Sequence, residues 1–368
     1  MQQWTHTSYT QQLVFGSGSL TRIGKLLKEL GLRRVLLVTT TGRHDSDDGE
    51  RVRRALGTTL ASTFAEVESH VPVPLVQRAV QQARRDAVDG VVSFGGGSCA
   101  DLGKAVCFFT EQEAGTPGAS YADRPALPHV TVPTTYSGAE LTGFFGMTDP
   151  AARQKTGGGG PTITPIAAIY DPDLTLSTPP RVSAETGMNA LAHCVEAVYS
   201  PKRTPEAEAI ALAGAKRIMN ALPLVVNDPG DVDVRASMFE GAALAGRALH
   251  NGTMGVHHGL SQLVGGRTGI PHGLANAMIL PHAMRFNAVA ADTELERLAQ
   301  AIGATEDAAS AVAALVQRLG LPSGLGECGV TLEDLDAVAR LSQSNHSVRQ
   351  NVRPVSEDEA REVLAAAY

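Results

Sequence analysis

The first half of the chain alternates short apolar runs with a segment whose apolar residues recur at helical spacing. Three short runs are rich in valine or leucine, and glycine, threonine or proline follows each of them. They are Val35–Thr39, Val91–Phe94 and Val130–Val132. The apolar residues of Leu75–Val88 recur every three or four positions, and Gly90 follows. The short runs predict strands and the longer segment predicts a helix. Strand–helix–strand alternation with short turns favours a parallel α/β sheet.

After about residue 180 the pattern becomes helical. Thr204-Pro205 combines an N-cap residue with a proline at the first helical position, and the apolar residues up to Leu222 keep to one face. Similar helical patterns cover Val234–Leu249, Thr293–Ile302 and Glu357–Ala367. The sequence therefore predicts an α/β domain over residues 1–180 and an all-helical domain over residues 181–368. A cleft between two domains is a usual place for a ligand.

Composition and charge narrow the class of protein. The 368 residues are 43% hydrophobic and 19% charged, which suits a soluble globular protein of two domains. A net charge of −7 gives no electrostatic reason to expect nucleic acid or an anionic membrane as a partner. The four cysteines form no CxxC pair, which excludes a zinc knuckle and a thioredoxin-type motif, and so few cysteines in a chain of this length indicate a reducing compartment. With no signal-peptide pattern and no membrane-length apolar run, we expect a cytoplasmic protein.

A glycine run follows the second predicted strand. The segment Phe94–Ser98 reads FGGGS, and Asp101 and Lys104 follow it. A strand that feeds glycines and then a helix can hold a phosphate, because the backbone N–H groups approach the anion closely and the helix dipole attracts it. Lys104, two turns into the helix, could support the helix or the phosphates. The alternative is a tight turn that binds nothing.

Two further segments of the first half are candidates for binding a nucleotide. Pro133–Gly138 (PTTYSG) places hydroxyl groups at the end of the third strand, where a pyrophosphate or ribose could bind. Lys155 precedes four glycines and could meet a phosphate or carboxylate, or the glycines could form only a flexible loop. The first strand ends without an acidic residue that would favour NAD. Because Arg43 and His44 could instead meet a 2′-phosphate, we expect NADPH or dual use.

Histidines gather in the second half of the chain. Asn189 and His193 are four residues apart and share one face of a helix. His257-His258 and Pro271-His272 follow in separate segments. Histidines from separate segments can converge on a metal ion or an anionic substrate, although a lone histidine is usually structural.

Five motifs carry a resemblance to a known family. They are GGGSxxDxxKA (95–105), PTT with Gly-x-Glu (133–140), GMNALAHCVEA (187–197), HHGLSQLVGG (257–266) and PHGLANAMILPH (271–282). Their order and intervals along the whole chain resemble the iron-containing alcohol dehydrogenase superfamily. Within this superfamily, four features are most similar to the maleylacetate reductases. They are Asn189, Tyr136, the pair His257-His258 and the NVRPV segment at 351–355. Those enzymes use NADH or NADPH to reduce maleylacetate to 3-oxoadipate in aromatic-compound degradation.

The resemblance implies a fold, cofactors and site residues. The fold is dehydroquinate synthase-like: an α/β dinucleotide-binding domain, an all-α domain, and an active site in the cleft. The resemblance also implies NAD(H) or NADP(H), a small anionic substrate and a homodimer. The cofactor-binding positions are Gly96, Gly97, Ser98, Asp101, Thr134, Thr135, Thr142 and Lys155. The catalytic positions are His258, His193 and His272. The positions that match metal ligands are Asn189, His193, His258 and His272.

Two departures from the family pattern affect the expected chemistry. Asn189 stands where metal-containing members have an aspartate, which weakens the case for bound Fe²⁺ or Zn²⁺, although three imidazoles can still hold zinc. Gln262 stands where a histidine is usual, and an amide cannot transfer a proton near neutral pH. We therefore expect an NAD(P)H-dependent reductase with His258 as the proton donor. A metal-dependent alcohol dehydrogenase or aldehyde reductase, and a non-redox lyase or cofactor-binding relative, are the alternatives.

Overall fold

The computed structural model describes residues 4–6, 8, 10–115, 127–150 and 154–368. These residues form two compact units, which divide between Thr178 and Pro179. The first unit begins at Ser8. Residues 4–6 group with the second unit, and His6 Nδ1 lies 2.9 Å from Thr204 Oγ1 there.

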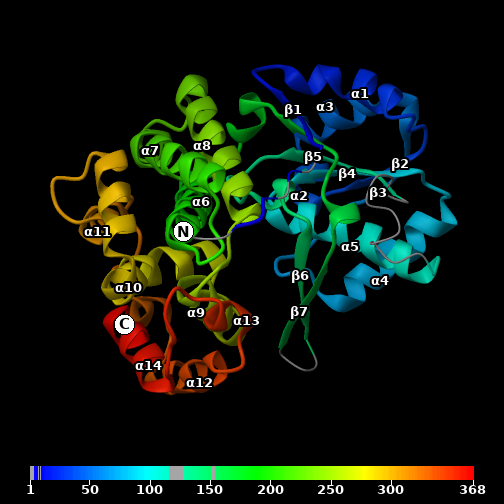
Figure 1. The fold of residues 1–368 in the computed structure, drawn as a ribbon. Helices are drawn as coiled ribbons and strands as arrows, with labels where there is room; N and C mark the ends of the chain where they lie inside the picture. Colours follow the sequence, from blue (N-terminus) through cyan, green and yellow to red (C-terminus); the bar gives the residue numbers. More distant parts are fainter. Residues whose placement is uncertain (1–3, 7, 9, 116–126, 151–153) are drawn as a thin grey trace. The chain divides into compact units, whose positions relative to one another are not determined.

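The first unit is built on a parallel sheet whose strands run in the order β1-β8-β5-β4-β2-β3 (Figure 1). The strands are β1 (Gln12–Phe15), β2 (Val35–Val38), β3 (Leu60–Phe64), β4 (Gly90–Gly95), β5 (His129–Pro133) and β8 (Ala167–Tyr170). The central strands β2, β4 and β5 are buried along their whole length. Helices cover both faces of such a sheet, which explains the unbroken apolar runs in the sequence. The predicted parallel α/β sheet is confirmed.

Helices flank both faces of this sheet (Figure 1). They are α1 (Ile23–Glu29), α2 (Thr41–His44), α3 (Asp47–Leu56), α4 (Val73–Arg85) and α5 (Gly97–Glu113). Residues of α4 and α5 pack with Leu36 and Val91 in one core, and residues of α1 and α3 pack with Val35 and Val92 in another. The predicted helix over Leu75–Val88 is α4, which ends earlier because Ala87 adopts a φ of 47°. A separate hairpin pairs β6 (Phe144–Asp149) with β7 (Gln154–Gly159).

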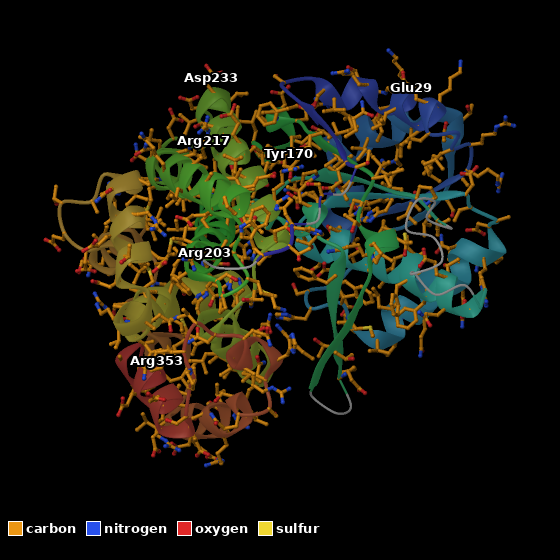
Figure 2. The ribbon with its side chains drawn as sticks, in the orientation of Figure 1. Glu29, Tyr170, Arg203, Arg217, Asp233 and Arg353 are labelled. Carbon is orange, nitrogen blue, oxygen red and sulfur yellow. The ribbon has the colours of Figure 1, made fainter. Side chains whose placement is uncertain are left out.

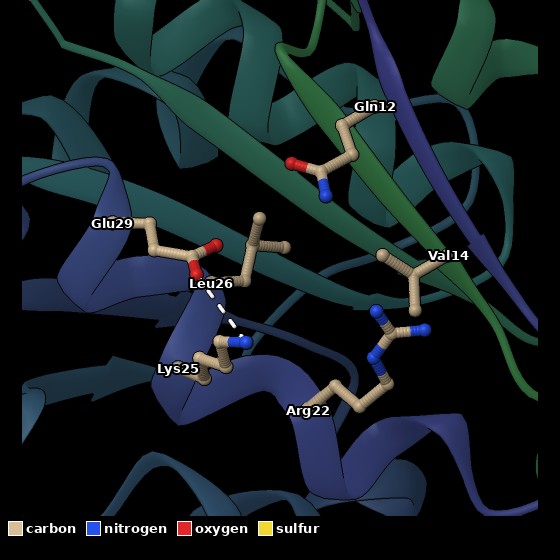
Figure 3. A pocket seen from close by; sticks show the side chains of 6 residues that line it. All are labelled: Gln12, Val14, Arg22, Lys25, Leu26 and Glu29. Atoms are coloured by element: carbon tan, nitrogen blue, oxygen red, sulfur yellow. Dashed lines mark ion pairs between the residues drawn. The ribbon is translucent and has the colours of Figure 1, made fainter.

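A small hollow lies between β1 and α1 (Figure 3). It holds about 20 Å³, which is room for one water molecule. Its lining residues are Gln12, Val14, Arg22, Lys25, Leu26 and Glu29. Lys25 Nζ and Glu29 Oε1 form an ion pair of 3.6 Å at its edge. The hollow contains none of the candidate site residues, and its size excludes a nucleotide or organic acid.

The second unit is helical. Its helices are α6 (Pro180–Tyr199), α7 (Pro205–Asn227), α8 (Val232–His250), α9 (Val256–Thr268), α10 (His272–Ile302), α11 (Ala308–Arg318), α12 (Leu332–Ser342), α13 (His346–Arg349) and α14 (Glu357–Ala366). Thr204 caps α7 by accepting from the N–H of Ala207, as predicted. The predicted helix over 293–302 is the last part of α10, where the non-helical backbone of Ala291 marks a kink. The predicted all-helical C-terminal half is confirmed.

One helix of the second unit resembles a membrane span in composition. Among the described helices, α7 alone is long and apolar enough to cross a membrane. Its residues pack against α6, α8 and α10, and Ala211, Ala215 and Ile218 are completely buried there. These contacts are those of a core helix of the unit.

Candidate active site

The glycine run forms the turn between β4 and α5. Gly95 ends β4 with a φ of 139°, a conformation that glycine adopts without strain. Gly96 is the N-cap of α5, and no side chain caps this end of the helix. Uncapped N–H groups and the helix dipole together attract an anion. The turn therefore has the backbone of a phosphate site.

The turn packs against the segment that follows β5, because the ends of β4 and β5 pair in the sheet. A methyl group added to Gly96 would lie 3.2 Å from Thr135 Cγ2, and one added to Gly97 would lie 3.0 Å from Ser137 Oγ. A side chain at either position would therefore require its neighbour to shift. The hydroxyl groups of Thr134 and Thr135 are buried without a hydrogen-bond partner among the described residues. Buried polar groups of this kind call for a ligand or water.

Lys104 is completely buried behind the turn. Its Nζ pairs with Asp101 Oδ1 at 2.9 Å and donates to the carbonyl of Ala139 at 2.9 Å and the hydroxyl of Thr142 at 3.3 Å. An ammonium group engaged in this way supports the fold, which decides between the two roles predicted for Lys104. The Thr142 hydroxyl is also buried and donates to Ala139. Lys155 lies exposed on β7.

Arg43 follows β2 on the one-turn helix α2. Its guanidinium donates to Ser177 Oγ at 2.5 Å and to Thr178 Oγ1 at 2.7 Å. Burial lowers the pKa of Arg43, while the nearby Asp48 and Cys99 oppose that shift. Cys99 lies on the first turn of α5, so Arg43 is close to the glycine turn. The sequence shows no acidic residue at the tip of β2, but the fold brings Asp48 Oδ2 to 4.0 Å from Arg43.

Histidines from three separate segments come together within the helical unit. α6 carries Asn189 and His193, α9 carries His258, and α10 begins at His272. The ring centroids of His193 and His258 lie 4.8 Å apart with the planes 13° from parallel. Those of His258 and His272 lie 6.2 Å apart. Three segments that are separate in sequence therefore form one imidazole cluster.

Glu196 is the member of this cluster that sequence reasoning missed. It follows His193 by three residues on α6 and is completely buried. Its Oε2 lies 2.5 Å from His258 Nδ1, and its Oε1 accepts from the N–H of Gly255 at 3.0 Å. The sequence signal was its place in the motif GMNALAHCVEA, at a spacing of seven from Asn189 on the same face. Only the fold shows that this face meets the start of α9.

The hydrogen bonds of the cluster define the tautomer of His258. His257 Nε2 lies 3.0 Å from the carbonyl oxygen of Asn276, which only accepts, so this nitrogen carries a hydrogen and Nδ1 is an acceptor. His258 Nδ1 lies 3.2 Å from His257 Nδ1 and is the donor to it and to Glu196. In the neutral ring, Nε2 of His258 therefore has the free lone pair. It is buried without a hydrogen-bond partner among the described residues.

Burial sets the charge of this cluster. It raises the pKa of the Glu196 carboxyl and lowers the pKa values of His258 and His193. Both directions disfavour an ion pair between a charged Glu196 and a charged His258, because removing two charges from water is unfavourable. The pair titrates as one coupled unit.

The four positions that match metal ligands do not form an ordinary metal site. Asn189 is uncharged, and its Oδ1 accepts a hydrogen bond of 2.6 Å from Asn276 Nδ2. A different group of three has its possible ligand atoms within 4.8 Å of one another. Among the described residues, this group is Glu196, His257 and His258. Hydrogen bonds already join these three, and 2.5 Å between Glu196 and His258 is too short for two ligands of one metal ion. The donor set therefore fits proton chemistry better than a metal ion.

Gln262 lies one helical turn after His258 on α9 and is partly buried. Residues four apart share a helix face, so its amide lies on the same side of α9 as His258. An amide can orient a polar substrate group but cannot supply a proton. Within this part of the helical unit, His258 is the better candidate for proton transfer.

The chain belongs to the iron-containing alcohol dehydrogenase family, and it is an oxidoreductase. The family description "Iron-containing alcohol dehydrogenase" matches residues 10–172, and "Fe-containing alcohol dehydrogenase family, C-terminal" matches residues 183–368. These two matches correspond to the α/β unit and the helical unit.

Within the family, the chain is similar to maleylacetate reductases over its full length. It is 35% identical to the maleylacetate reductase of Rhizobium sp. (strain MTP-10005), covering 100% of this chain and 98% of the relative. The crystal structure of maleylacetate reductase from Agrobacterium tumefaciens matches with a TM-score of 0.88 and 34% identity, covering 100% and 99% of the two chains. Sulfoacetaldehyde reductase from Bifidobacterium kashiwanohense, solved in complex with NAD+, matches with a TM-score of 0.89 and 26% identity, covering 100% and 99%.

Proposed function

We propose that this protein is an NAD(P)H-dependent reductase that converts maleylacetate to 3-oxoadipate in the degradation of aromatic compounds. The observation that carries the proposal is the imidazole cluster. Beside it, Asn189 stands at the position of a carboxylate ligand and accepts a hydrogen bond from Asn276. The full-length likeness to maleylacetate reductases supports the same substrate. The bound coenzyme supplies the hydride, which goes to the carbon β to the substrate ketone and leaves an enolate.

The residues of the helical unit complete the reduction. The Glu196–His258 pair has two forms. In one form, His258 Nε2 has a free lone pair. The form that donates holds one more proton, and Nε2 carries a hydrogen. His258 Nε2 gives that proton to the α-carbon of the enolate. The negative charge that returns to Glu196 is stabilised by the N–H of Gly255 and the start of α9. His193 and His272 stabilise the enolate oxygen by donating hydrogen bonds.

The coenzyme is proposed to bind to the α/β unit. Gly96, Gly97 and Ser98 at the uncapped start of α5 would hold its pyrophosphate, and the hydroxyl groups of Thr134 and Thr135, which have no partner among the described residues, would donate hydrogen bonds to it. Asp101 and Thr142 support this region through Lys104. Lys155, which is exposed on β7, would offer its ammonium group to a phosphate of the coenzyme. These roles follow from the family positions and from the geometry of the turn.

The test of the proposed function is NAD(P)H oxidation at 340 nm with maleylacetate. Turnover with stoichiometric 3-oxoadipate supports the proposal. No turnover with maleylacetate, but metal-dependent oxidation with an aldehyde panel, would favour an alcohol dehydrogenase or aldehyde reductase. Bound coenzyme without any net oxidation would favour the lyase-type or binding relative.

Chelator treatment is expected to leave maleylacetate reduction within about twofold of the untreated rate. The reason is that Asn189 contributes no charge and is already hydrogen-bonded to Asn276. The matched variant is Asn189→Asp, which restores a carboxylate and is expected to raise the zinc or iron content of the purified protein. Elemental analysis and rates before and after chelation measure both effects. A rate that collapses on chelation and returns with Fe²⁺ or Zn²⁺ would contradict the metal-free proposal.

We propose that the coenzyme is NADPH, or NADPH and NADH alike, because Arg43 on α2 follows β2 and offers its guanidinium to a 2′-phosphate. Arg43→Gln is expected to weaken NADPH binding about tenfold. This loss is at the lower end of what one hydrogen bond to a charged group contributes, because Asp48 already offsets part of the positive charge of Arg43. NADH binding is expected to change less than twofold. Fluorescence titration with both coenzymes measures the difference. Equal losses for both would show that Arg43 only supports the fold through Ser177 and Thr178.

The cytoplasm is the proposed compartment, and a homodimer is the proposed assembly. All four cysteines are free thiols, which suits a reducing compartment. The family resemblance implies the dimer. Light scattering of the purified enzyme tests it, and a mass of one chain would contradict it.

A further inference from the structure

The helix that carries His257 and His258 cannot cap its own start. The N-cap of α9 is Gly255, which has no side chain to accept from the first N–H groups. The first N–H groups of a helix have no partners within it and require acceptors from elsewhere. At α9 these acceptors come from two distant parts of the chain.

Glu196 and Asn351 supply the missing cap. Glu196 Oε1 accepts from the N–H of Gly255 at 3.0 Å, and the nearby backbone N–H groups of His257 and His258 lower the pKa of its carboxyl against the larger effect of burial. Asn351 Oδ1 accepts from the N–H of Val256 at 3.1 Å. Together they accept hydrogen bonds from the N–H groups of Gly255 and Val256, where α9 begins.

Asn351 is held in place by its own hydrogen bonds. Its Nδ2 donates to Asn287 Oδ1 at 2.7 Å and to the carbonyl of Arg353 at 3.0 Å. Asn287 Nδ2 donates back to Asn351 Oδ1 at 3.1 Å. Arg353, labelled in Figure 2, packs over the ring of Phe286 at 4.2 Å and pairs with Glu359. The side chain of Asn351 is therefore fixed on every side.

The start of α9 packs closely against residues 345–351, which comprise α13 and its two ends. A methyl group at Gly255 would lie 2.5 Å from Asn351 Oδ1 and 3.0 Å from Glu196 Oε1. One at Gly259 would lie 2.4 Å from Val348 Cγ2. Gly255 and Gly259 are four apart, so one face of α9 is without side chains where it meets this segment. This contact leaves little freedom in the position of the first turn.

We propose that Asn351 is a positioning residue for His258. It holds the N–H of Val256, and thereby the first turn of α9, at the place where His258 Nδ1 donates to Glu196 and Nε2 faces the imidazole cluster. Asn351 acts through the backbone and touches no reacting atom. The expected effect of Asn351 on turnover rests on the proposed function. Its expected effect on the His258 ring does not depend on the substrate. It also assigns a role to the NVRPV segment, which begins at Asn351.

The test compares Asn351→Ala with Asn287→Ala. The first removes the acceptor of Val256 N–H, whereas the second removes a buried partner of Asn351 and leaves that acceptor. For Asn351→Ala we expect kcat with maleylacetate to fall about tenfold or more, with the KM for NADPH within twofold of wild type. For Asn287→Ala, Asn351 still accepts from the Val256 N–H and donates to the Arg353 carbonyl, so we expect a lower Tm with kcat within about threefold. Asn351→Asp keeps the acceptor oxygen and is expected to recover most of kcat.

A spectroscopic measurement separates positioning from general destabilisation. Protein labelled with ¹⁵N-histidine reports the tautomer, and His258→Gln identifies the signals of His258. The wild type is expected to show hydrogen on Nδ1, and Asn351→Ala is expected to shift or average these signals while Asn287→Ala does not. If folded Asn351→Ala keeps both kcat and the His258 signals, the inference is wrong. If wild-type protein does not reduce maleylacetate, the proposed function fails, and the ¹⁵N comparison still decides the role of Asn351. Should Asn351→Ala not fold, Asn351→Asp decides alone: altered His258 signals with the acceptor oxygen retained would contradict the inference.

Discussion

His258→Gln is expected to lower kcat for maleylacetate reduction by about 10²- to 10⁴-fold, the usual contribution of a positioned proton donor. Glutamine can donate a hydrogen bond but cannot transfer a proton near neutral pH. Steady-state rates at 340 nm measure the effect, with thermal unfolding to show that the variant is folded. A cost of about 1–3 kcal/mol in stability is also expected, because Glu196 loses its imidazole partner.

The control for this substitution is His282→Gln. His282 lies ten residues after His272 on α10 and is only partly buried. Its replacement is expected to leave kcat within about twofold. The wild-type rate is also expected to fall as the pH rises through the apparent pKa of the Glu196–His258 pair, because the donating form holds one more proton. An unchanged rate in folded His258→Gln would remove His258 from the mechanism.

Gly97→Ala is expected to weaken coenzyme binding by about 10- to 150-fold, which corresponds to one lost charge-assisted hydrogen bond of roughly 1.5–3 kcal/mol. The added methyl would lie 3.0 Å from Ser137 Oγ, so the turn or Ser137 must shift. Either shift moves the N–H groups at the start of α5 away from the phosphates. Fluorescence titration with NADPH gives the dissociation constant directly.

Gly24→Ala is the matched control for the glycine turn. Gly24 lies on α1 in the same unit, and an added methyl there meets only Ala55 O at 3.4 Å, an ordinary contact. We expect normal coenzyme affinity in this variant. Wild-type affinity in folded Gly97→Ala would place the phosphates elsewhere in the unit.

The two substitutions separate binding from chemistry. His258→Gln removes a group of the helical unit and is expected to leave the dissociation constant for NADPH unchanged. Gly97→Ala changes the α/β unit and is expected to leave kcat at saturating coenzyme within a few-fold. If both substitutions lowered kcat and affinity together, a general loss of structure would explain them better than the proposed roles.

The sequence alone determined the local elements of this protein. Buried strands such as β4 are unbroken apolar runs because helices cover both sheet faces, and the start of α7 is encoded by Thr204 and Pro205. The FGGGS turn is also a local feature, since Gly95 adopts a φ of 139°, which glycine adopts without strain. The motif order was enough to predict the family and to name the three histidines that the fold brings together.

Only the tertiary structure decided which side chains complete the site. Glu196 contacts His258 across 62 positions of sequence, and Asn351 caps Val256 across 95. Periodicity reports the face of a helix on which a residue lies, but it does not report which segment that face meets. The same limit applies to Lys104, whose ammonium turns inward to Asp101 instead of toward a phosphate. The chemistry of the proposed site therefore depends on long-range packing, because the proton of His258 is placed by residues that no local pattern connects to it.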